Sequence, residues 1–173
     1  MPGTAPSFAK WGFLAIVLFS IYALLLLGVI LFKFPFQYQL TATGRELNLI
    51  PFAGSFANRR GFGVSDVVEN VLIFVPLGVY ISMLRREWSF ARKIVIIAAT
   101  STAFETIQFV FAIGRADITD VLSNTAGGLV GIGLYALSTK ALGRKTDHIL
   151  TVVALVVTAL ALAFFTYLRL HSK

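Results

Sequence analysis

The amino-acid sequence predicts an all-α integral membrane protein, a bundle of five transmembrane helices with a long loop between the first two. The chain of 173 residues is 57% hydrophobic and only 13% charged, whereas a soluble domain is about half apolar and a quarter charged. Its mean hydropathy is +0.83. Five stretches approach the 20 or so apolar residues that a spanning helix needs. No linker or internal repeat divides the chain, so a single membrane domain over residues 1–173 is expected.

The five expected helices differ in the number of polar and charged side chains that they contain. The first is almost unbroken hydrocarbon and is too long for the apolar core of a signal peptide, so we expect it to be retained. The fifth contains no charged residue, whereas the second, third and fourth contain ionisable or amide side chains. The expected spans cover residues 11–32, 67–84, 94–113, 118–137 and 149–168.

Charge and residue types exclude several classes of function. The chain has no cysteine, which excludes thiolate catalysis and zinc-thiolate sites. His148 and His171 stand at the two ends of the last apolar stretch, where interfacial positions are expected. The net charge of +7 is attributed to Lys and Arg beside the membrane, which set topology and meet anionic headgroups. Nucleic acid is therefore not an expected partner, whereas membrane lipids are.

Positive charge also suggests an orientation in a bacterial cell membrane. Five spans place the two termini on opposite sides. The short loops "RREWSFARK" (85–93) and "STKALGRKTD" (138–147) are dense in Lys and Arg beside helix ends, which is typical of cytoplasmic loops. We therefore expect a cytoplasmic N-terminus, with the C-terminus and the loop between the first two helices outside the cell.

Polar side chains recur at helical spacing in three of the expected helices. Residues three or four apart share a helix face, and an ionised side chain that faces lipid costs several kcal/mol. Each stripe should therefore face protein or a wet cavity, and topology places all three stripes in the same outer third of the bilayer. We expect them to share a polar pocket. The stripes are Asp66, Glu69 and Asn70; Glu105 and Gln108; and Asp117, Asp120 and Asn124.

A purely structural explanation competes with the pocket. Asn and Gln side chains often tie membrane helices together, each for about 0.6 kcal/mol. Arg115 and Asp117 could simply cap the fourth helix and meet headgroups. Glu105 fits this explanation less well, because a buried carboxylate is a costly tie where an amide would serve.

Glycines in the fourth helix indicate close helix packing. Gly127 and Gly131 have GxxxG spacing, and Gly128 and Gly133 lie beside them. Small residues of this kind let a second helix approach closely. We expect packing against the second or third helix of the same chain rather than dimerisation.

The long loop carries a second group of candidate residues. Its segment "NLIPF" (48–52) is expected to dip into the membrane interface and cover the pocket. Arg45, Arg59 and Arg60 could hold a phosphate or anionic headgroup through paired hydrogen bonds. Equally, this basic loop could rest on lipid phosphates.

Four motifs resemble the VanZ-like family. They are "NLIPF" (48–52), "NVLIFVPLGVY" (70–80), "FETIQFVF" (104–111) and "GRADITDVLSNTAGGLVGIGLY" (114–135), within a core of about residues 45–137. The family is named for a member associated with low-level resistance to teicoplanin, a lipid-bearing glycopeptide. The resemblance implies a role for these positions: Asn48, Pro51, Phe52, Asn70, Pro76, Gly78, Glu105, Gln108, Arg115, Asp117, Asp120, Asn124, Gly127 and Gly128.

Three functions remain open from the sequence. The first is binding of an amphiphilic lipid, a lipid-linked cell-wall precursor or a lipoglycopeptide in the outer-leaflet pocket. The expected ligand-binding residues are Asn48, Arg45, Arg59, Arg60, Asn70, Gln108, Arg115, Asp117 and Asn124.

The second function is an enzyme acting on a lipid-linked or phosphate-bearing substrate. Glu105 and Asp120 would then be the acid and base. Alternatively, Asp120 with Glu105 or Asp66 would hold Mg²⁺ or Ca²⁺ through oxygen ligands. The sequence identifies no cofactor.

The third is an ion-coupled transporter. It fits less well, because transporters usually bind at the membrane midplane between repeats.

Overall fold

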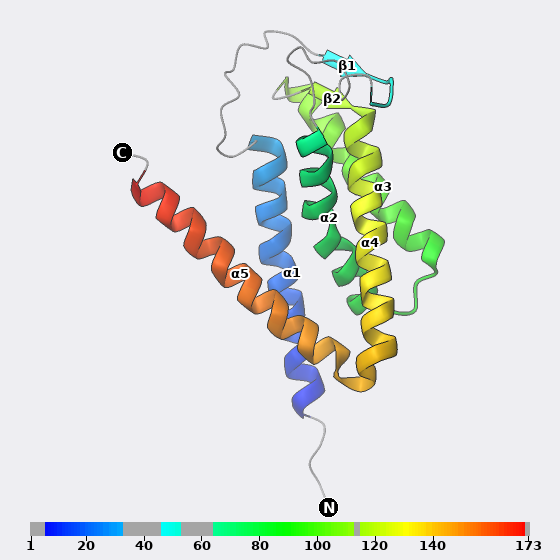
Figure 1. The fold of residues 1–173 in the computed structure, drawn as a ribbon, viewed down its shortest axis with the longest axis vertical. Coiled ribbons are helices and arrows are strands. Elements are labelled where there is room, and N and C mark those ends of the chain that lie inside the picture. The colour runs from blue at the N-terminus through cyan, green and yellow to red at the C-terminus, as the bar shows by residue number, and fades with distance from the viewer. Residues whose placement is uncertain (1–5, 33–45, 53–63, 113–114, 172–173) are drawn as a thin grey trace, which may run out of the picture. The chain divides into compact units, whose positions relative to one another are not determined.

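Helices make up nearly all of the described structure, as the sequence predicts. The computed structural model describes residues 6–32, 46–52, 64–112 and 115–171 (Figure 1). Two three-residue strands and one 3-10 turn join the helices. In chain order the elements are α1 (Pro6–Phe32), β1 (Glu46–Asn48), α2 (Val64–Leu84), α3 (Phe90–Phe111), β2 (Arg115–Asp117), α4 (Ile118–Leu142), η1 (Gly143–Lys145) and α5 (Thr146–His171).

The helices are long and apolar enough for a multi-pass membrane protein. Four segments of the described helices meet this standard: Trp11–Ile30, Val64–Leu84, Phe90–Phe111 and Ile118–Leu168. The fourth segment runs through both α4 and α5, so five separate spans stay a prediction. Of the long loop between α1 and α2, only residues 46–52 are described.

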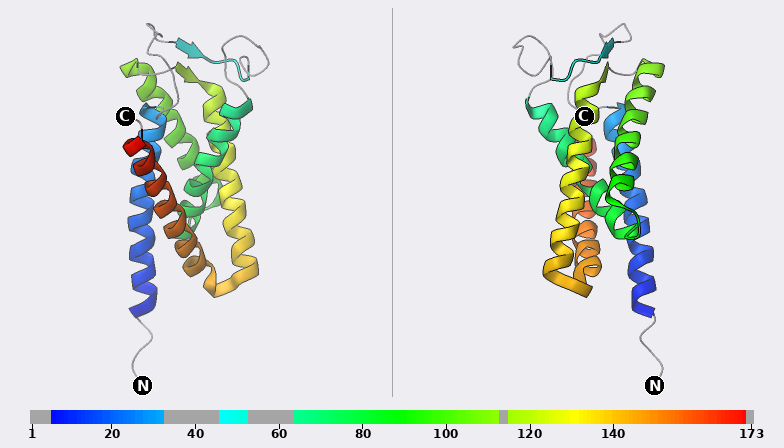
Figure 2. Two further views of the ribbon diagram at one scale, coloured as in Figure 1. Left: turned by 60° about the vertical axis from the view of Figure 1, so that its left-hand side comes forward. Right: turned by 90° about the vertical axis from the view of Figure 1, so that its right-hand side faces the viewer.

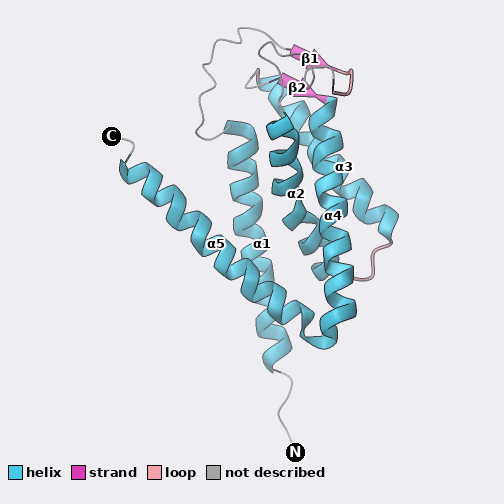
Figure 3. Cartoon of the chain, viewed as in Figure 1, coloured by secondary structure: helices cyan, strands magenta, loops and turns pink. Residues whose placement is uncertain are grey.

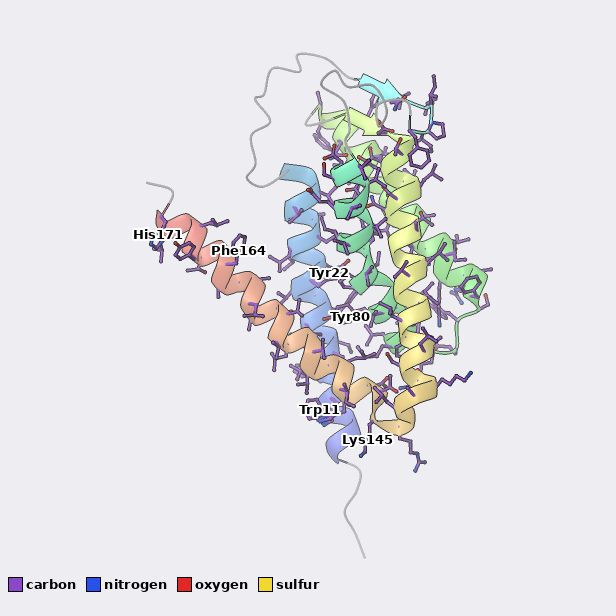
Figure 4. The ribbon with its side chains drawn as sticks, viewed as in Figure 1. Trp11, Tyr22, Tyr80, Lys145, Phe164 and His171 are labelled. Atoms are coloured by element: carbon purple, nitrogen blue, oxygen red, sulfur yellow. The ribbon has the colours of Figure 1, made fainter. Side chains whose placement is uncertain are left out.

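The chain forms two compact units. The first combines Met1–Leu25 with Leu137–Lys173, and the second is Leu26–Ala136. In the first unit, the ring of Trp11, which is labelled in Figure 4, meets the ring of His148 of α5 edge-on, with centroids 4.0 Å apart. The turn before α5 is fixed by Thr146, whose buried hydroxyl donates to the Gly143 carbonyl at 2.8 Å. Both histidines are exposed at the ends of α5, where the sequence places them.

In the second unit, α2, α3 and α4 lie side by side (Figure 2). Their apolar core includes Phe74, Ile97 and Phe104, of which Phe74 and Ile97 have no exposed surface. The rings of Phe74 and Phe104 meet edge-on with centroids 6.5 Å apart. This packing brings the polar stripes of three helices into one layer.

Glycines allow α4 to touch the backbone of α2. A methyl group on Gly127 would collide with the carbonyl of Val71, and one on Gly131 with the carbonyl of Val75. Gly133 faces open space and would accept a methyl group without collision. The predicted packing against the second helix is confirmed for Gly127 and Gly131, but not for Gly133.

Two of the motifs meet at the same seam. A methyl group on Gly78, in "PLGVY", would collide with the backbone of Gly128, in "NTAGG". A methyl group on Gly128 would in turn meet the side chain of Ile97 on α3. Gly78 and Gly128 are therefore small because two helix backbones touch there.

A short parallel strand pair stands at one end of the second unit (Figure 3). Residues Glu46, Leu47 and Asn48 of β1 pair with Arg115, Ala116 and Asp117 of β2 in that order. The sequence analysis predicted neither strand, because three residues are too few to show an alternating pattern. The pairing confirms that the loop after α1 and the α3–α4 turn lie at the same end. Which side of the membrane they face stays a prediction.

Candidate functional site

Buried polar side chains gather where α3 ends and α4 begins. Glu105 and Gln108 of α3 are 7% and 2% exposed, and Asp120 and Asn124 of α4 are 7% and 3% exposed. Groups of this kind need hydrogen-bond partners when they are removed from water. We call the whole set the polar cluster. It comprises Asn48, Asn70, Ser101, Glu105, Gln108, Asp117, Thr119, Asp120 and Asn124.

Asp117, at the end of β2, is the centre of the polar cluster. Its Oδ2 accepts a hydrogen bond from Asn48 Nδ2 at 2.8 Å, and its Oδ1 accepts one from the Thr119 N–H at 2.8 Å. Its own N–H donates to Glu105 Oε2 at 2.8 Å. One buried residue thus joins β1, the first turn of α4 and the inner face of α3.

The "NLIPF" segment is seated on the start of α4. Asn48 Oδ1 accepts from the Ile50 N–H at 3.1 Å and closes a turn. The Phe52 N–H donates to Thr119 Oγ1 at 3.0 Å, with Phe52 in the left-handed region at φ 59°. Leu49 and Ile50 stay 67% and 68% exposed. The segment lies beside the polar cluster as predicted, whereas its entry into the membrane interface stays a prediction.

Amide side chains connect α4 to α2 and α3. Asn70 Nδ2 of α2 donates to Asp120 Oδ1 at 2.7 Å. Asn124 Nδ2 donates to Ser101 Oγ of α3 at 2.9 Å. These bonds bring together the three helices whose polar stripes the sequence singled out.

Gln108 ties α3 to the end of α1. Its Nε2 donates to the Ile30 carbonyl at 2.9 Å. Gln108 Oε1 and Asn124 Oδ1, however, are buried and accept no hydrogen bond from the described residues. A buried acceptor without a partner costs about 1–3 kcal/mol, so such atoms are places for water or a donating ligand.

Two hydroxyl groups of the polar cluster were not predicted from the sequence. Ser101 stands one turn before Glu105 on the same stripe, so its spacing gave a weak signal. Thr119 lies between Asp117 and Asp120 and gave none. Both are buried and receive hydrogen bonds from polar groups of other elements.

Glu69 does not join the polar cluster. The sequence analysis placed it on an inward stripe with Asp66 and Asn70, but Glu69 is exposed. Positions i+3 and i+4 lie about 100° apart around a helix. When Asn70 turns toward α4, Glu69 turns out of the bundle near the helix end, where a carboxylate can reach water.

Of the four arginines predicted to bind a ligand, only Arg115 lies among the described residues. Arg45, Arg59 and Arg60 lie outside the described residues. The backbone of Arg115 pairs with Glu46 in the strand pair. Among the described residues, no three or more His, Asp or Glu side chains are grouped to hold a metal ion.

The contacts of the polar cluster support both explanations drawn from the sequence. Asn48, Asn70 and Asp117 each hold one chain segment to another, as the structural explanation expects. The two acceptors without described partners, on Gln108 and Asn124, are not accounted for in this way.

Comparison with known proteins identifies the family. The family model described as VanZ/LLP1 matches residues 19–139, which include every residue of the polar cluster. The chain is 36% identical to Protein VanZ of Enterococcus faecium over 159 residues, covering 89% of this chain and 94% of that protein. No solved structure matches the chain. The sequence motifs and the family match therefore agree, and the chain belongs to the VanZ/LLP1 family of membrane proteins.

Proposed function

We propose that this VanZ-family protein binds an amphiphilic lipid or lipophilic antibiotic at the polar cluster, in the outer leaflet of the cell membrane. Binding would contribute to resistance against teicoplanin or other lipoglycopeptides, or to homeostasis of the envelope. One observation carries the proposal. Gln108 Oε1 and Asn124 Oδ1 are buried acceptors without a described donor, inside a cluster that other residues tie together on several sides.

The cluster favours a ligand that offers N–H or O–H groups. Its acceptors without a donor among the described residues are the amide oxygens of Gln108 and Asn124. Sugar hydroxyls, amines and peptide N–H groups complement such a site. A lipoglycopeptide or a lipid-linked cell-wall precursor carries these groups next to an acyl chain.

The surroundings of the cluster suit the apolar part of an amphiphile. Leu49 and Ile50, seated beside the cluster, are largely exposed. Phe111, at the end of α3, is 69% exposed. An acyl chain lying along these side chains would keep its polar head next to the cluster.

Orientation is tested by labelling. Because the natural chain has no cysteine, a single Leu49→Cys variant reports one position. We expect an impermeant thiol reagent to label it from outside intact cells. Labelling only after the cytoplasm is opened would contradict the outer-leaflet site.

Ligand binding is tested with two variants of the polar cluster. Glu105→Gln keeps an oxygen for the Asp117 N–H but removes a charge, and Asn124→Leu removes the buried acceptor together with the bond to Ser101. Ser101→Ala removes that bond but leaves Asn124 Oδ1 in place, so it separates the two effects. We expect Glu105→Gln and Asn124→Leu each to lower affinity for teicoplanin or the co-purified lipid about tenfold, or about 1.4 kcal/mol. Native mass spectrometry and teicoplanin susceptibility are the measurements. Gly133→Ala, which faces open space, is the control.

The outcomes separate binding from the alternative enzymatic function. If folded variants keep both resistance and bound ligand, the proposed binding site is wrong. Lost resistance with retained ligand would favour an enzyme that uses Glu105 and Asp120 on a lipid-linked or phosphate-bearing substrate. In the structure these two carboxylates already accept hydrogen bonds, from the Asp117 N–H and from Asn70.

A further inference from the structure

We infer that the turn between α2 and α3 is a binding site for the phosphate headgroup of an anionic phospholipid. The turn carries Arg85, Trp88 and Arg92. The guanidinium carbon of Arg92 lies 4.5 Å from the centroid of the Trp88 ring, and that of Arg85 lies 5.6 Å from it. Two positive groups therefore converge on one aromatic ring.

Backbone geometry holds this arrangement in place. The Trp88 N–H donates to the Arg85 carbonyl at 3.2 Å, which closes the turn that follows α2. The Ser89 hydroxyl accepts from the Arg92 N–H at 3.2 Å and begins α3. Both bonds fix the backbone that carries the two arginines and Trp88. The site is thus formed by local structure, without the rest of the molecule.

Arg85 and Arg92 of this turn have no ion-pair partner among the described residues. Over the fully described stretch 84–112, neither Arg85 nor Arg92 forms an ion pair, and Glu87 between them is exposed and pairs with neither. Two guanidinium groups beside one indole repel each other, so a nearby anion relieves that repulsion. Arg86 differs, because its guanidinium lies over Tyr135 of α4 at 6.0 Å.

Chemistry and position select a phospholipid as the anion. Guanidinium groups bind phosphate through paired, charge-assisted hydrogen bonds. Tryptophan prefers the level of the headgroups, and basic residues at helix ends attract anionic lipid. This turn joins two helices that are each apolar enough to span a membrane. A headgroup phosphate therefore reaches it without leaving the bilayer surface.

This site is independent of the proposed function. The turn precedes the first residue of α3, whereas the polar cluster begins at Ser101, near the middle of that helix. Ser101 lies about 16 Å from Phe90 along the helix axis, and Glu105 and Gln108 lie further from the turn. Loss of one site need not affect the other, so each can be tested alone.

Trp88 itself reports the lipid beside it. The chain has two tryptophans, so a Trp11→Phe background leaves Trp88 as the only one. In vesicles of phosphatidylcholine with increasing brominated phosphatidylglycerol, bromine quenches the fluorescence of the adjacent tryptophan. We expect quenching of Trp88 to saturate at low fractions of phosphatidylglycerol, which gives a relative affinity well above that for phosphatidylcholine.

Two double variants decide between a site and diffuse attraction. Arg85→Gln with Arg92→Gln should lower the preference for phosphatidylglycerol about tenfold. Lys140→Gln with Arg144→Gln removes the same charge from exposed positions and should keep the preference. An equal loss in both, or no preference in the starting protein, overturns the inference.

Two further measurements test the remaining alternatives. Arg85→Lys with Arg92→Lys keeps the charge but not the planar fork, and should keep only part of the preference. If this variant has the same preference for phosphatidylglycerol as the starting protein, positive charge alone explains the preference and the inference fails. Glycerol phosphate in solution should not reduce the quenching; if it does so at concentrations comparable to the lipid, the site binds free phosphate esters rather than lipid.

Discussion

α4 and α5 are both apolar helices of similar length, yet they bury very different residues. α4 buries polar and small side chains along one face, including Asp120, Asn124 and Gly127. In α5 the buried side chains among those described are Thr146 and Thr151, whereas most of its large apolar residues are exposed. The family match ends at residue 139, just before α5 begins.

The difference teaches that hydropathy and packing are separate properties in a membrane protein. Apolar side chains gain little by leaving hydrocarbon lipid for a protein core. Small residues that allow close approach, and polar groups that need partners, therefore mark where the chain packs on itself. In this protein glycines in close backbone contact occur in α2 and α4, and buried carboxylates and amides occur in α3 and α4, whereas the described residues of α5 include neither.

The glycine seam should give the largest contrast. Gly131→Ala places a methyl group against the Val75 carbonyl and should destabilise the protein by about 3 kcal/mol. Gly133→Ala, two residues along, meets nothing and should be neutral or slightly stabilising. Thermal unfolding in detergent compares the two. Equal midpoints would mean that α2 and α4 do not touch closely.

The bond between Asp117 and Asn48 should come next. Asp117→Asn replaces a carboxylate oxygen that accepts from Asn48, and should cost about 2 kcal/mol because that bond is charge-assisted. A double-mutant cycle of Asn48→Ala and Asp117→Ala measures their coupling by chemical or thermal unfolding. Strict additivity of the two changes would show that β1 is not held by this bond.

Neighbouring hydroxyls on α3 offer a smaller, matched test. Ser101→Ala removes the acceptor of the Asn124 amide and should cost about 1 kcal/mol. Thr102→Ala removes only a bond to the carbonyl of its own helix from an exposed position, and should be close to neutral. The same unfolding assay ranks them. A larger effect at Thr102 would contradict the inward face assigned to α3.

α5 should give the smallest effect. Leu160 is 65% exposed, so Leu160→Ala should change unfolding by less than about 0.5 kcal/mol. A loss comparable to that of a buried leucine, about 2–5 kcal/mol, would show that α5 packs against protein at this position. That result would remove the contrast between the two helices.

The helices were predictable because hydrocarbon length is a direct constraint on them. Hydropathy marks the apolar run and not the helix end, so α3 begins at Phe90, four residues before the predicted start. Arg92 and Lys93 lower the hydropathy of the first turn, so the apolar run begins after them. Ser89 caps the helix ahead of these charged residues, which therefore belong to α3. Residues 46–48 and 115–117 were too short to be recognised as strands.

Most residues of the polar cluster could be predicted from the sequence, but their hydrogen-bond partners could not. Spacing selected Glu105, Gln108, Asp120 and Asn124, because an apolar background makes a polar stripe conspicuous. Their partners include hydroxyls and the backbone carbonyl of Ile30. Such groups occur in every helix, so the sequence does not show which of them accept these hydrogen bonds. Only the folded structure identifies the donor–acceptor pairs.

The parallel strand pair also orders the assembly of the protein. Asn48 and Asp117 are 69 residues apart in the chain, and α2 and α3 lie between them. Their bond forms only after both helices have entered the bilayer and returned the chain to the side it left. An error in either crossing would leave β1 and β2 on opposite membrane faces. The pair thus acts as a check on topology, because a chain halted before residue 115 lacks β2 and cannot form it.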